Sequence, residues 1–157
     1  MTLGTVEIPP LEGTVADMLA FKGTTIHAVA PDATVYDAIA KMDERRVGAL
    51  LVMRGEQLVG VISERDYTRK VILRGRASQA TPVEEIMSAN VISVRPDMSL
   101  GECLQLVTDR GIRHLPVVEN DRVVGLLSIG DLVRAVVAQQ AETISSLKSF
   151  IGSDYPA

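Results

Sequence analysis

The stretch Gly60-Val61-Ile62-Ser63-Glu64-Arg65-Asp66 returns later in the chain as Gly125-Leu126-Leu127-Ser128-Ile129-Gly130-Asp131. Glycine, serine and aspartate recur at one offset of 65 residues, and an arginine follows each copy at that offset. Each copy is typical of an apolar β-strand that runs into a helix, with a hydroxyl at the junction and a carboxylate three residues later. Because the first N–H groups of a helix lack partners within it, such a junction can hold a phosphate. The recurrence predicts two similar pockets.

The same residues also have a purely structural interpretation. Ser-x-x-Asp is related to the capping box, in which the hydroxyl accepts from the third helical N–H and an acidic side chain reaches back to the cap. Capping alone would explain either copy, whereas recurrence in register favours a shared function. The two roles are compatible, since a residue that caps a helix in the empty protein can contact a ligand when one binds.

Composition argues against several classes of protein. The 157 residues suffice for one domain or for two small, mutually dependent halves. A net charge of −4, no Trp, two Phe and three Tyr argue against a nucleic-acid-binding protein, which needs a basic face or aromatic platforms. The single cysteine, Cys103, lies in an apolar helical pattern and is expected to be buried, which excludes a disulfide framework within one chain. With no signal peptide and no stretch near the roughly 20 apolar residues of a membrane span, we expect a cytoplasmic protein without a membrane partner.

Hydrophobic periodicity divides the chain into two repeats. We expect a flexible arm at residues 1–13, a first repeat at 14–75, a linker at 76–82, a second repeat at 83–138 and a C-terminal helix or tail at 139–157. The first repeat predicts a helix at 14–21, a strand at 25–29, a helix from Thr34, strands at 48–53 and 57–62, and a helix from Ser63. The second predicts a helix at 83–87, a strand at 91–94, a helix capped by Ser99 with Glu102, strands at 114–118 and 122–127, and a helix from Ser128.

The two repeats align without a gap from Val29 and Val94 to Val71 and Val136. Self-similarity over this length indicates a duplicated supersecondary unit, in which each copy leaves an apolar sheet face for the other to cover. We therefore expect a mixed α/β (α+β) fold, with two pseudo-symmetric α-β-α-β-β-α repeats packed through their sheets as one module. Beyond these repeats, apolar residues at helical spacing predict packing on the module or on a second subunit: Ile144, Leu147, Phe150 and Ile151.

With both motifs in register, the chain resembles a tandem pair of cystathionine-β-synthase (CBS) domains, or Bateman module. The residues that carry the resemblance are Gly60 to Asp66, Gly125 to Asp131, the Pro-Asp pairs at Pro31 and Pro96, and the strand Arg113-His114-Leu115-Pro116-Val117. It covers nearly all of residues 14–138. The resemblance implies a regulatory module that binds an adenosine-containing ligand such as AMP, ADP, ATP, NAD or S-adenosylmethionine. It also implies that the motif aspartate contacts ribose and that the serine and the helix N-terminus contact phosphate.

In this family each cleft takes its serine and aspartate from one repeat and its base-enclosing residues from the other. The resemblance therefore implies a first pocket formed by Ile62, Ser63, Arg65, Asp66, Asn90, Ile92, Ile112, Arg113 and His114. It implies a second pocket formed by Leu127, Ser128, Asp131, Lys22, Thr25, His27, Val47 and Gly48.

Charge distinguishes the two expected pockets. A phosphate in the first would meet Arg65, Arg113 and His114, whereas the second offers Lys22 and His27. Charge-assisted hydrogen bonds contribute roughly 1.5–3 kcal/mol each before desolvation and entropy are subtracted. We therefore expect the first pocket to prefer a phosphate or pyrophosphate and the second to bind more weakly. The two histidines form no recognisable metal motif, so no metal is expected.

Three functions are compared for such a chain. The favoured one is an adenine-nucleotide sensor whose ligand changes its shape or its homodimer and thereby alters an unknown partner protein. The second is an enzyme, which the absence of a Walker-type motif and of a nucleophile-base set argues against. The third is a structural dimerisation module with no physiological nucleotide.

Overall fold

The computed structural model describes residues 11–154 of the chain, and the side chains at 143 and 146–154 fall outside that description. In the first half the elements are α1 (Val15–Lys22), β1 (Ala28–Val29), α2 (Val35–Arg45), β2 (Ala49–Arg54), β3 (Gln57–Ser63), α3 (Glu64–Tyr67) and the π-helical turn η1 (Thr68–Ile72). In the second they are the 3₁₀ turn η2 (Val83–Glu85), α4 (Leu100–Arg110), β4 (His114–Glu119), β5 (Arg122–Ser128) and α5 (Ile129–Asp154). The mixed fold expected from the sequence is confirmed.

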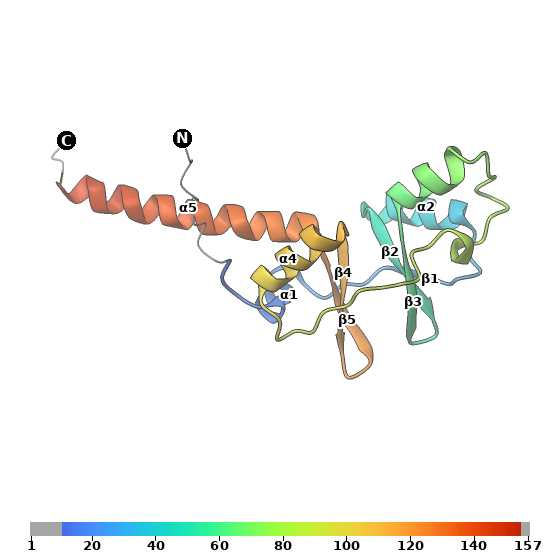
Figure 1. Cartoon of the computed structure of the whole chain (residues 1–157), viewed down its shortest axis with the longest axis horizontal. Coiled ribbons are helices and arrows are strands. Elements are labelled where there is room, and N and C mark those ends of the chain that lie inside the picture. Colours follow the sequence, from blue (N-terminus) through green and yellow to red (C-terminus); the bar gives the residue numbers. More distant parts are fainter. Residues whose placement is uncertain (1–10, 155–157) are drawn as a thin grey trace.

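The sheets of the two halves repeat one pattern, and their hairpins lie side by side (Figure 1). In the first half β1 pairs in parallel with β2, which pairs antiparallel with β3. In the second half β4 and β5 form the antiparallel hairpin, and a single parallel bridge from Val94 to Val117 stands in place of the first strand. Both hairpins shift register at matching positions, after Val52 and after Val117. The duplication therefore extends to irregularities of the backbone.

Helix caps form where hydroxyl residues precede the helices. Thr34 accepts from the backbone N–H of Asp37 at 3.1 Å and starts α2. Ser99 and Glu102 form the capping box expected at the start of α4. Such caps satisfy N–H groups that the helix leaves unpaired, and each contributes about 1 kcal/mol.

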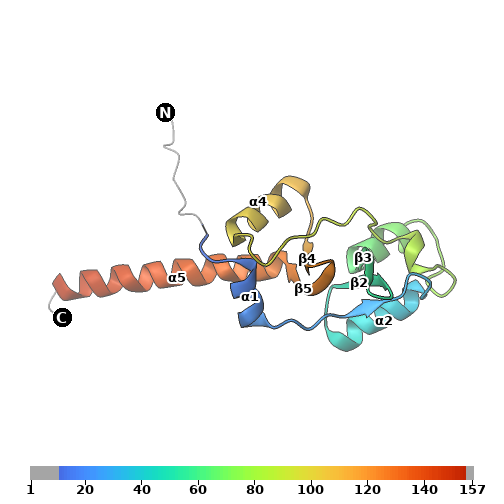
Figure 2. The same ribbon diagram turned by 90° about the horizontal axis from the view of Figure 1, so that it is seen from below.

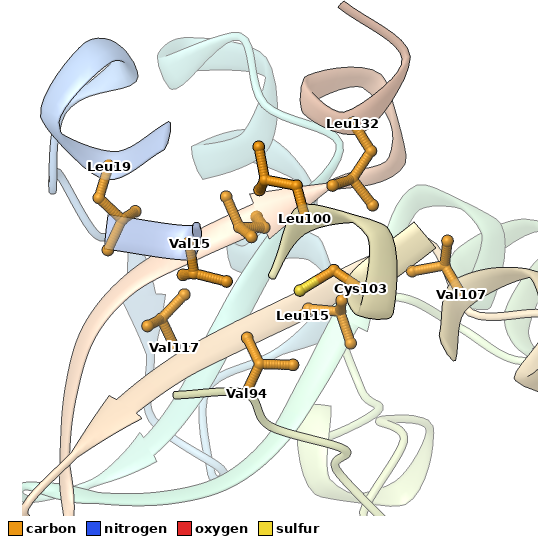
Figure 3. Close-up of a cluster of buried hydrophobic side chains, with 10 residues drawn as sticks. Val15, Leu19, Val94, Leu100, Cys103, Val107, Leu115, Val117 and Leu132 are labelled. Atoms are coloured by element: carbon orange, nitrogen blue, oxygen red, sulfur yellow. The ribbon is translucent and has the colours of Figure 1, made fainter. Parts of the chain in front are cut away.

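The hydrophobic cores exchange their first helical elements. Val15 and Leu19 of α1 are buried in the core of the second half, together with Val94, Leu100, Cys103, Val107, Leu115, Val117, Leu127 and Leu132 (Figure 3). Conversely, Val83 of η2 and Ile86 directly after it are buried in the core of the first half. Backbone hydrogen bonds fix both exchanges, from Val15 N to Met98 O at 2.9 Å and from Val83 N to Ala33 O at 2.8 Å. Packing therefore crosses the expected repeat boundaries, and the two halves depend on each other.

The glycine that opens each repeated motif permits this exchange. A Cβ added at Gly125 would lie 2.6 Å from Leu19 Cδ2, and one at Gly60 would lie 2.4 Å from Met87 Sδ. Real side chains do not approach so closely, so only glycine, which has no Cβ, fits at these two positions. Each motif glycine thus leaves room for a side chain of the exchanged segment, Leu19 at Gly125 and Met87 at Gly60.

The last helix, α5, continues well past the body of the protein (Figures 1 and 2). In the first half the corresponding helical segment, α3 with η1, already ends at Ile72, and Gly75 follows with a left-handed φ of +65°. The side chains of Val133, Val137 and Ile144 are more than half exposed along α5. The packing expected of Leu147, Phe150 and Ile151 lies outside the described side chains. Within residues 11–154, no helix combines the length and apolarity needed to cross a membrane.

Candidate functional site

A cleft of about 610 Å³ lies between the two halves of the protein. Four segments line it: Gly48 just before β2, the end of β3 with the helical turns after it, the connector between η2 and α4, and the turn that leads into β4. The lining residues are Gly48, Val61, Ser63, Glu64, Arg65, Asp66, Arg69, Lys70, Ser88, Asn90, Val91, Ile92, Gly111, Ile112, Arg113 and His114. The structure therefore brings together eight residues of the expected first pocket, with Ile62 the exception.

Ser63 and Asp66 form a capping box on one wall of this cleft. The backbone N–H of Ser63 donates to Asp66 Oδ2 at 2.9 Å, and the N–H of Asp66 donates to Ser63 Oγ at 3.2 Å. Lys70 Nζ lies 3.1 Å from Asp66 Oδ1, and the Asp66 side chain remains 14% exposed. The capping interpretation of the motif is therefore confirmed. The carboxylate still faces the cleft, where its remaining lone pairs can accept hydroxyl groups of a ligand.

Unpaired positive charge distinguishes the cleft. Arg65, Arg69 and Arg113 line it, and within the described part of the chain their guanidinium groups make no hydrogen bond or ion pair. Lys70 also lies there, between Asp66 and the backbone carbonyl of Ile86 at 2.8 Å. Guanidinium groups present several fixed donors that match phosphate oxygens, so this arrangement is suited to an anionic ligand.

His114 enters the cleft from β4 as a partly buried side chain. Burial lowers its pKa below the usual 6.5, and the positive charges of Arg113 and Lys22 act in the same direction. The imidazole is therefore mainly neutral at pH 7 and offers a hydrogen bond rather than a charge. This finding reduces the charge that the sequence assigned to the first pocket.

The second motif has the same capping box but a different set of partners. The N–H of Ser128 donates to Asp131 Oδ2 at 2.8 Å, and the N–H of Asp131 donates to Ser128 Oγ at 3.2 Å. Lys22 Nζ donates to Asp131 Oδ2 at 2.6 Å and to the carbonyl of Leu126 at 2.7 Å. Arg134 donates to Asp131 Oδ1 at 2.6 Å, and the Asp131 side chain is only 4% exposed.

Those partners set the ionisation of Asp131. Its burial by itself would raise the pKa of the carboxyl, but the hydrogen bonds from Lys22, the Ser128 backbone and Arg134 outweigh burial and lower it. The carboxylate is therefore charged, and it accepts hydrogen bonds from Lys22, Ser128 and Arg134.

Of the other residues expected in the second pocket, only Gly48 lines the cleft described above. Leu127 is buried in the second core, as Ile62 is in the first. Thr25, His27 and Val47 do not line the large cleft, and Gly48, assigned to the second pocket, lies in the first cleft instead. A second cavity of about 470 Å³, between the hairpin ends and the connector, is lined by Gln57, Leu58, Ala89, Val91, Ser93, Val118, Asp121 and Val123.

The sequence analysis missed several cleft residues. Arg69 and Lys70 each follow a predicted cleft residue, Arg65 and Asp66, by four positions, and residues so spaced share one face of a helix. That spacing could have identified both. Glu64, Ser88 and Gly111 carry no comparable signal, because only the folded connector and turn bring them to the cleft.

Among the described residues, neither a reactive thiol nor a cluster of metal-binding side chains is present. Burial, together with the charge of Glu102, raises the pKa of the Cys103 thiol to about 11, so it is no nucleophile at neutral pH. Within residues 11–154 no cluster of three His, Cys, Asp or Glu side chains could hold a metal ion.

Comparisons with known proteins agree with this architecture. The sequence profile of the CBS domain matches residues 23–72 and 83–138. The mitochondrial CBS domain-containing protein CBSX3 of Arabidopsis thaliana is 41% identical over 151 residues, which span 90% of this chain and 73% of the relative.

Solved structures show the same arrangement. A candidate signal-transduction protein with CBS domains from Burkholderia ambifaria is 50% identical, with a TM-score of 0.79 over 82% of this chain and 96% of that one. The CBS domain pair of MJ0100, solved in complex with 5′-methylthioadenosine and S-adenosyl-L-methionine, gives a TM-score of 0.73 over 82% of this chain and 98% of that one. Its identity is 22%, so this last likeness concerns the fold alone.

Proposed function

The chain belongs to the CBS domain family, and from this premise we propose that it is a regulatory module that binds an adenine nucleotide in the cleft between its halves. The observation that carries the proposal is the combination of a capped, cleft-facing Asp66 with three unpaired arginines in a cavity of about 610 Å³. A cavity of this size falls within the range of small-molecule sites.

Each part of a nucleotide has a matching group in the cleft. Asp66 accepts hydrogen bonds and suits the two hydroxyl groups of a ribose. Arg65, Arg69 and Arg113 suit phosphate, and a hydrogen bond to a charged group contributes roughly 1.5–3 kcal/mol net. Ile92 and Ile112, both half-buried, offer apolar surface for a base. The ligands that fit are AMP, ADP, ATP and NAD, with the phosphate-free S-adenosylmethionine using the arginines least.

Regulation requires that the ligand favours one arrangement of the protein over another. The cleft is lined from both halves, so a ligand that contacts both walls would fix their relative position. The exposed apolar side chains of Val133, Val137 and Ile144 on α5 support a homodimer through this helix. A ligand-dependent change of the halves or of the dimer would then alter a partner protein.

The proposal is tested by thermal unfolding with AMP, ADP, ATP, NAD and S-adenosylmethionine. At 100 times its dissociation constant, a ligand that binds only the folded protein adds about 2.7 kcal/mol, which raises the melting temperature by several degrees. We expect a shift with at least one phosphate-bearing ligand, and Asp66→Asn and Arg65→Gln should remove or strongly reduce it. Arg95→Gln is the matched control, because Arg95 is exposed, pairs with Asp97 and does not line the cleft.

Three outcomes would redirect the assignment. If no ligand shifted the melting temperature, the structural dimerisation module would replace the nucleotide sensor. If a ligand were consumed during incubation, an enzymatic role would have to be considered. If Arg65→Ala left affinity unchanged while Ser128→Ala abolished it, the ligand would occupy the second motif instead of the first.

A further inference from the structure

The two motifs differ most at one pair of equivalent positions. Leu19 packs on Gly125 and Met87 packs on Gly60, so these two residues occupy matching places in the exchanged elements. Three residues further along the chain stand Lys22 and Asn90. Asn90 lines the open cleft, whereas Lys22 reaches Asp131 at 2.6 Å and the carbonyl of Leu126 at 2.7 Å. The duplicated fold therefore allows a comparison between the first motif, where Asn90 leaves the aspartate facing a cleft, and the second, where Lys22 covers it.

The contacts of Lys22 involve the groups that a ligand would need. In the first motif the aspartate retains 14% exposure, faces a cleft of about 610 Å³ and pairs with one cation, Lys70, which lies 3.1 Å from Oδ1, comes from the same helical segment and is 38% exposed. In the second motif the aspartate is 4% exposed and pairs with two cations, Lys22 at Oδ2 and Arg134 at Oδ1. A ribose hydroxyl is a neutral donor, and it would have to displace a charge-assisted bond that is roughly twice as strong.

The two cations on Asp131 are not equivalent. Arg134 is on the same helix, three residues away, and its side chain is 70% exposed, so it can swing into solvent. Lys22 comes from α1, is 30% exposed, and is held at a second point by the carbonyl of Leu126. Because α1 is packed into the second core through Val15 and Leu19, Lys22 is delivered to Asp131 by a fixed element. Lys22 is therefore the contact that a ligand cannot easily displace.

We propose that Lys22 is an internal latch that closes the second motif, so that each chain binds one nucleotide, and that removal of the Lys22 charge opens a second site. The inference rests on the proposed function, since it takes the second motif to be a nucleotide site of the same kind as the first. The charge that remains on Asp131 after the change is still compensated by Arg134 and by the Ser128 N–H. Neutral variants at Lys22 are therefore expected to fold.

The test measures AMP stoichiometry per chain by equilibrium dialysis. Wild type should bind one AMP, Lys22→Met and Lys22→Gln should bind two, and Lys22→Arg, which keeps the charge, should bind one. The double variant Lys22→Met with Asp131→Asn should return to one. The latch would be overturned if wild type bound two AMP molecules per chain. It would also be overturned if wild type and both neutral variants each bound one. Either result would leave the proposed function standing.

A ligand-free measurement separates the latch from the proposed function. Acylation of the Lys22 amine, followed by mass spectrometry, should be slow in wild type and several-fold faster in Asp131→Asn, where the ion pair is lost. If wild type bound no AMP, AMP would be excluded as the ligand, and the acylation rate alone would decide whether the Lys22–Asp131 ion pair forms. Equal acylation rates in wild type and Asp131→Asn would overturn the latch whatever the AMP result.

Discussion

The contact between Gly125 and Leu19 makes a quantitative prediction about stability. An alanine Cβ at position 125 would lie 2.6 Å from Leu19 Cδ2, 3.0 Å from Cδ1 and 3.4 Å from Cγ, so the whole side chain of this buried leucine must move. Overpacking of this kind costs about 1–3 kcal/mol, and the lower entropy of the unfolded alanine chain offsets about 0.4–1 kcal/mol. We expect Gly125→Ala to lower the free energy of unfolding by about 1–2 kcal/mol.

The assay is equilibrium unfolding in urea, with Gly130→Ala as the matched control from the same motif. A Cβ at Gly130 would meet its nearest neighbour, Ser128 Oγ, at an ordinary 3.5 Å, and alanine is favoured in a helix by up to about 1 kcal/mol. The control should therefore be neutral or stabilising. In a double-mutant cycle, Leu19→Ala should relieve the clash, so that Gly125→Ala costs less in that background. A Gly125→Ala change within about 0.5 kcal/mol of wild type, or strict additivity with Leu19→Ala, would refute the reasoning.

Three further predictions concern other parts of the molecule. The Cys103 thiol, buried and with its pKa raised to about 11, should not react with Ellman's reagent in the folded protein and should react on denaturation; similar rates in both states would contradict its burial. Because the pKa of His114 is lowered in the folded state, the unfolded chain binds more protons below about pH 6.5, so stability should fall as the pH drops through that value. His114→Gln should lose less stability than wild type between pH 7 and pH 5.5, and equal losses would remove His114 as the cause. Exchange of exposed Val133 and Val137 for glutamate should convert the proposed homodimer into a monomer by light scattering, and an unchanged mass would exclude α5 from the interface.

The sequence predicted the local structure well because local structure depends on neighbouring residues. Ser63 with Asp66 and Ser99 with Glu102 form the capping boxes that their three-residue spacing predicts. The hairpins fall within one or two residues of their predicted bounds, since the apolar runs and the turns between them are read directly from the chain. The first strand is shorter than predicted, at Ala28–Val29, because only these residues pair with β2.

Long-range partners could not be predicted in the same way. The spacing of apolar residues in α1 predicts that Val15 and Leu19 point inward, but it does not show that they are buried in the core of the other half. Lys22 was expected near the second motif, yet its ion pair with Asp131 joins residues 109 positions apart and depends on that exchange. The expected ranking of the pockets, with the first preferring a phosphate or pyrophosphate and the second binding more weakly, stays a prediction.

The most direct test of the account is a crystal structure of the protein with AMP at saturating concentration. The account predicts nucleotide density in the cleft, with the ribose at Asp66, the phosphate near Arg65 and Arg113, and Lys22 still bound to Asp131. Density at Asp131 in place of Lys22, or an empty cleft in a crystal whose dissolved protein shows no AMP-dependent rise in melting temperature, would contradict it.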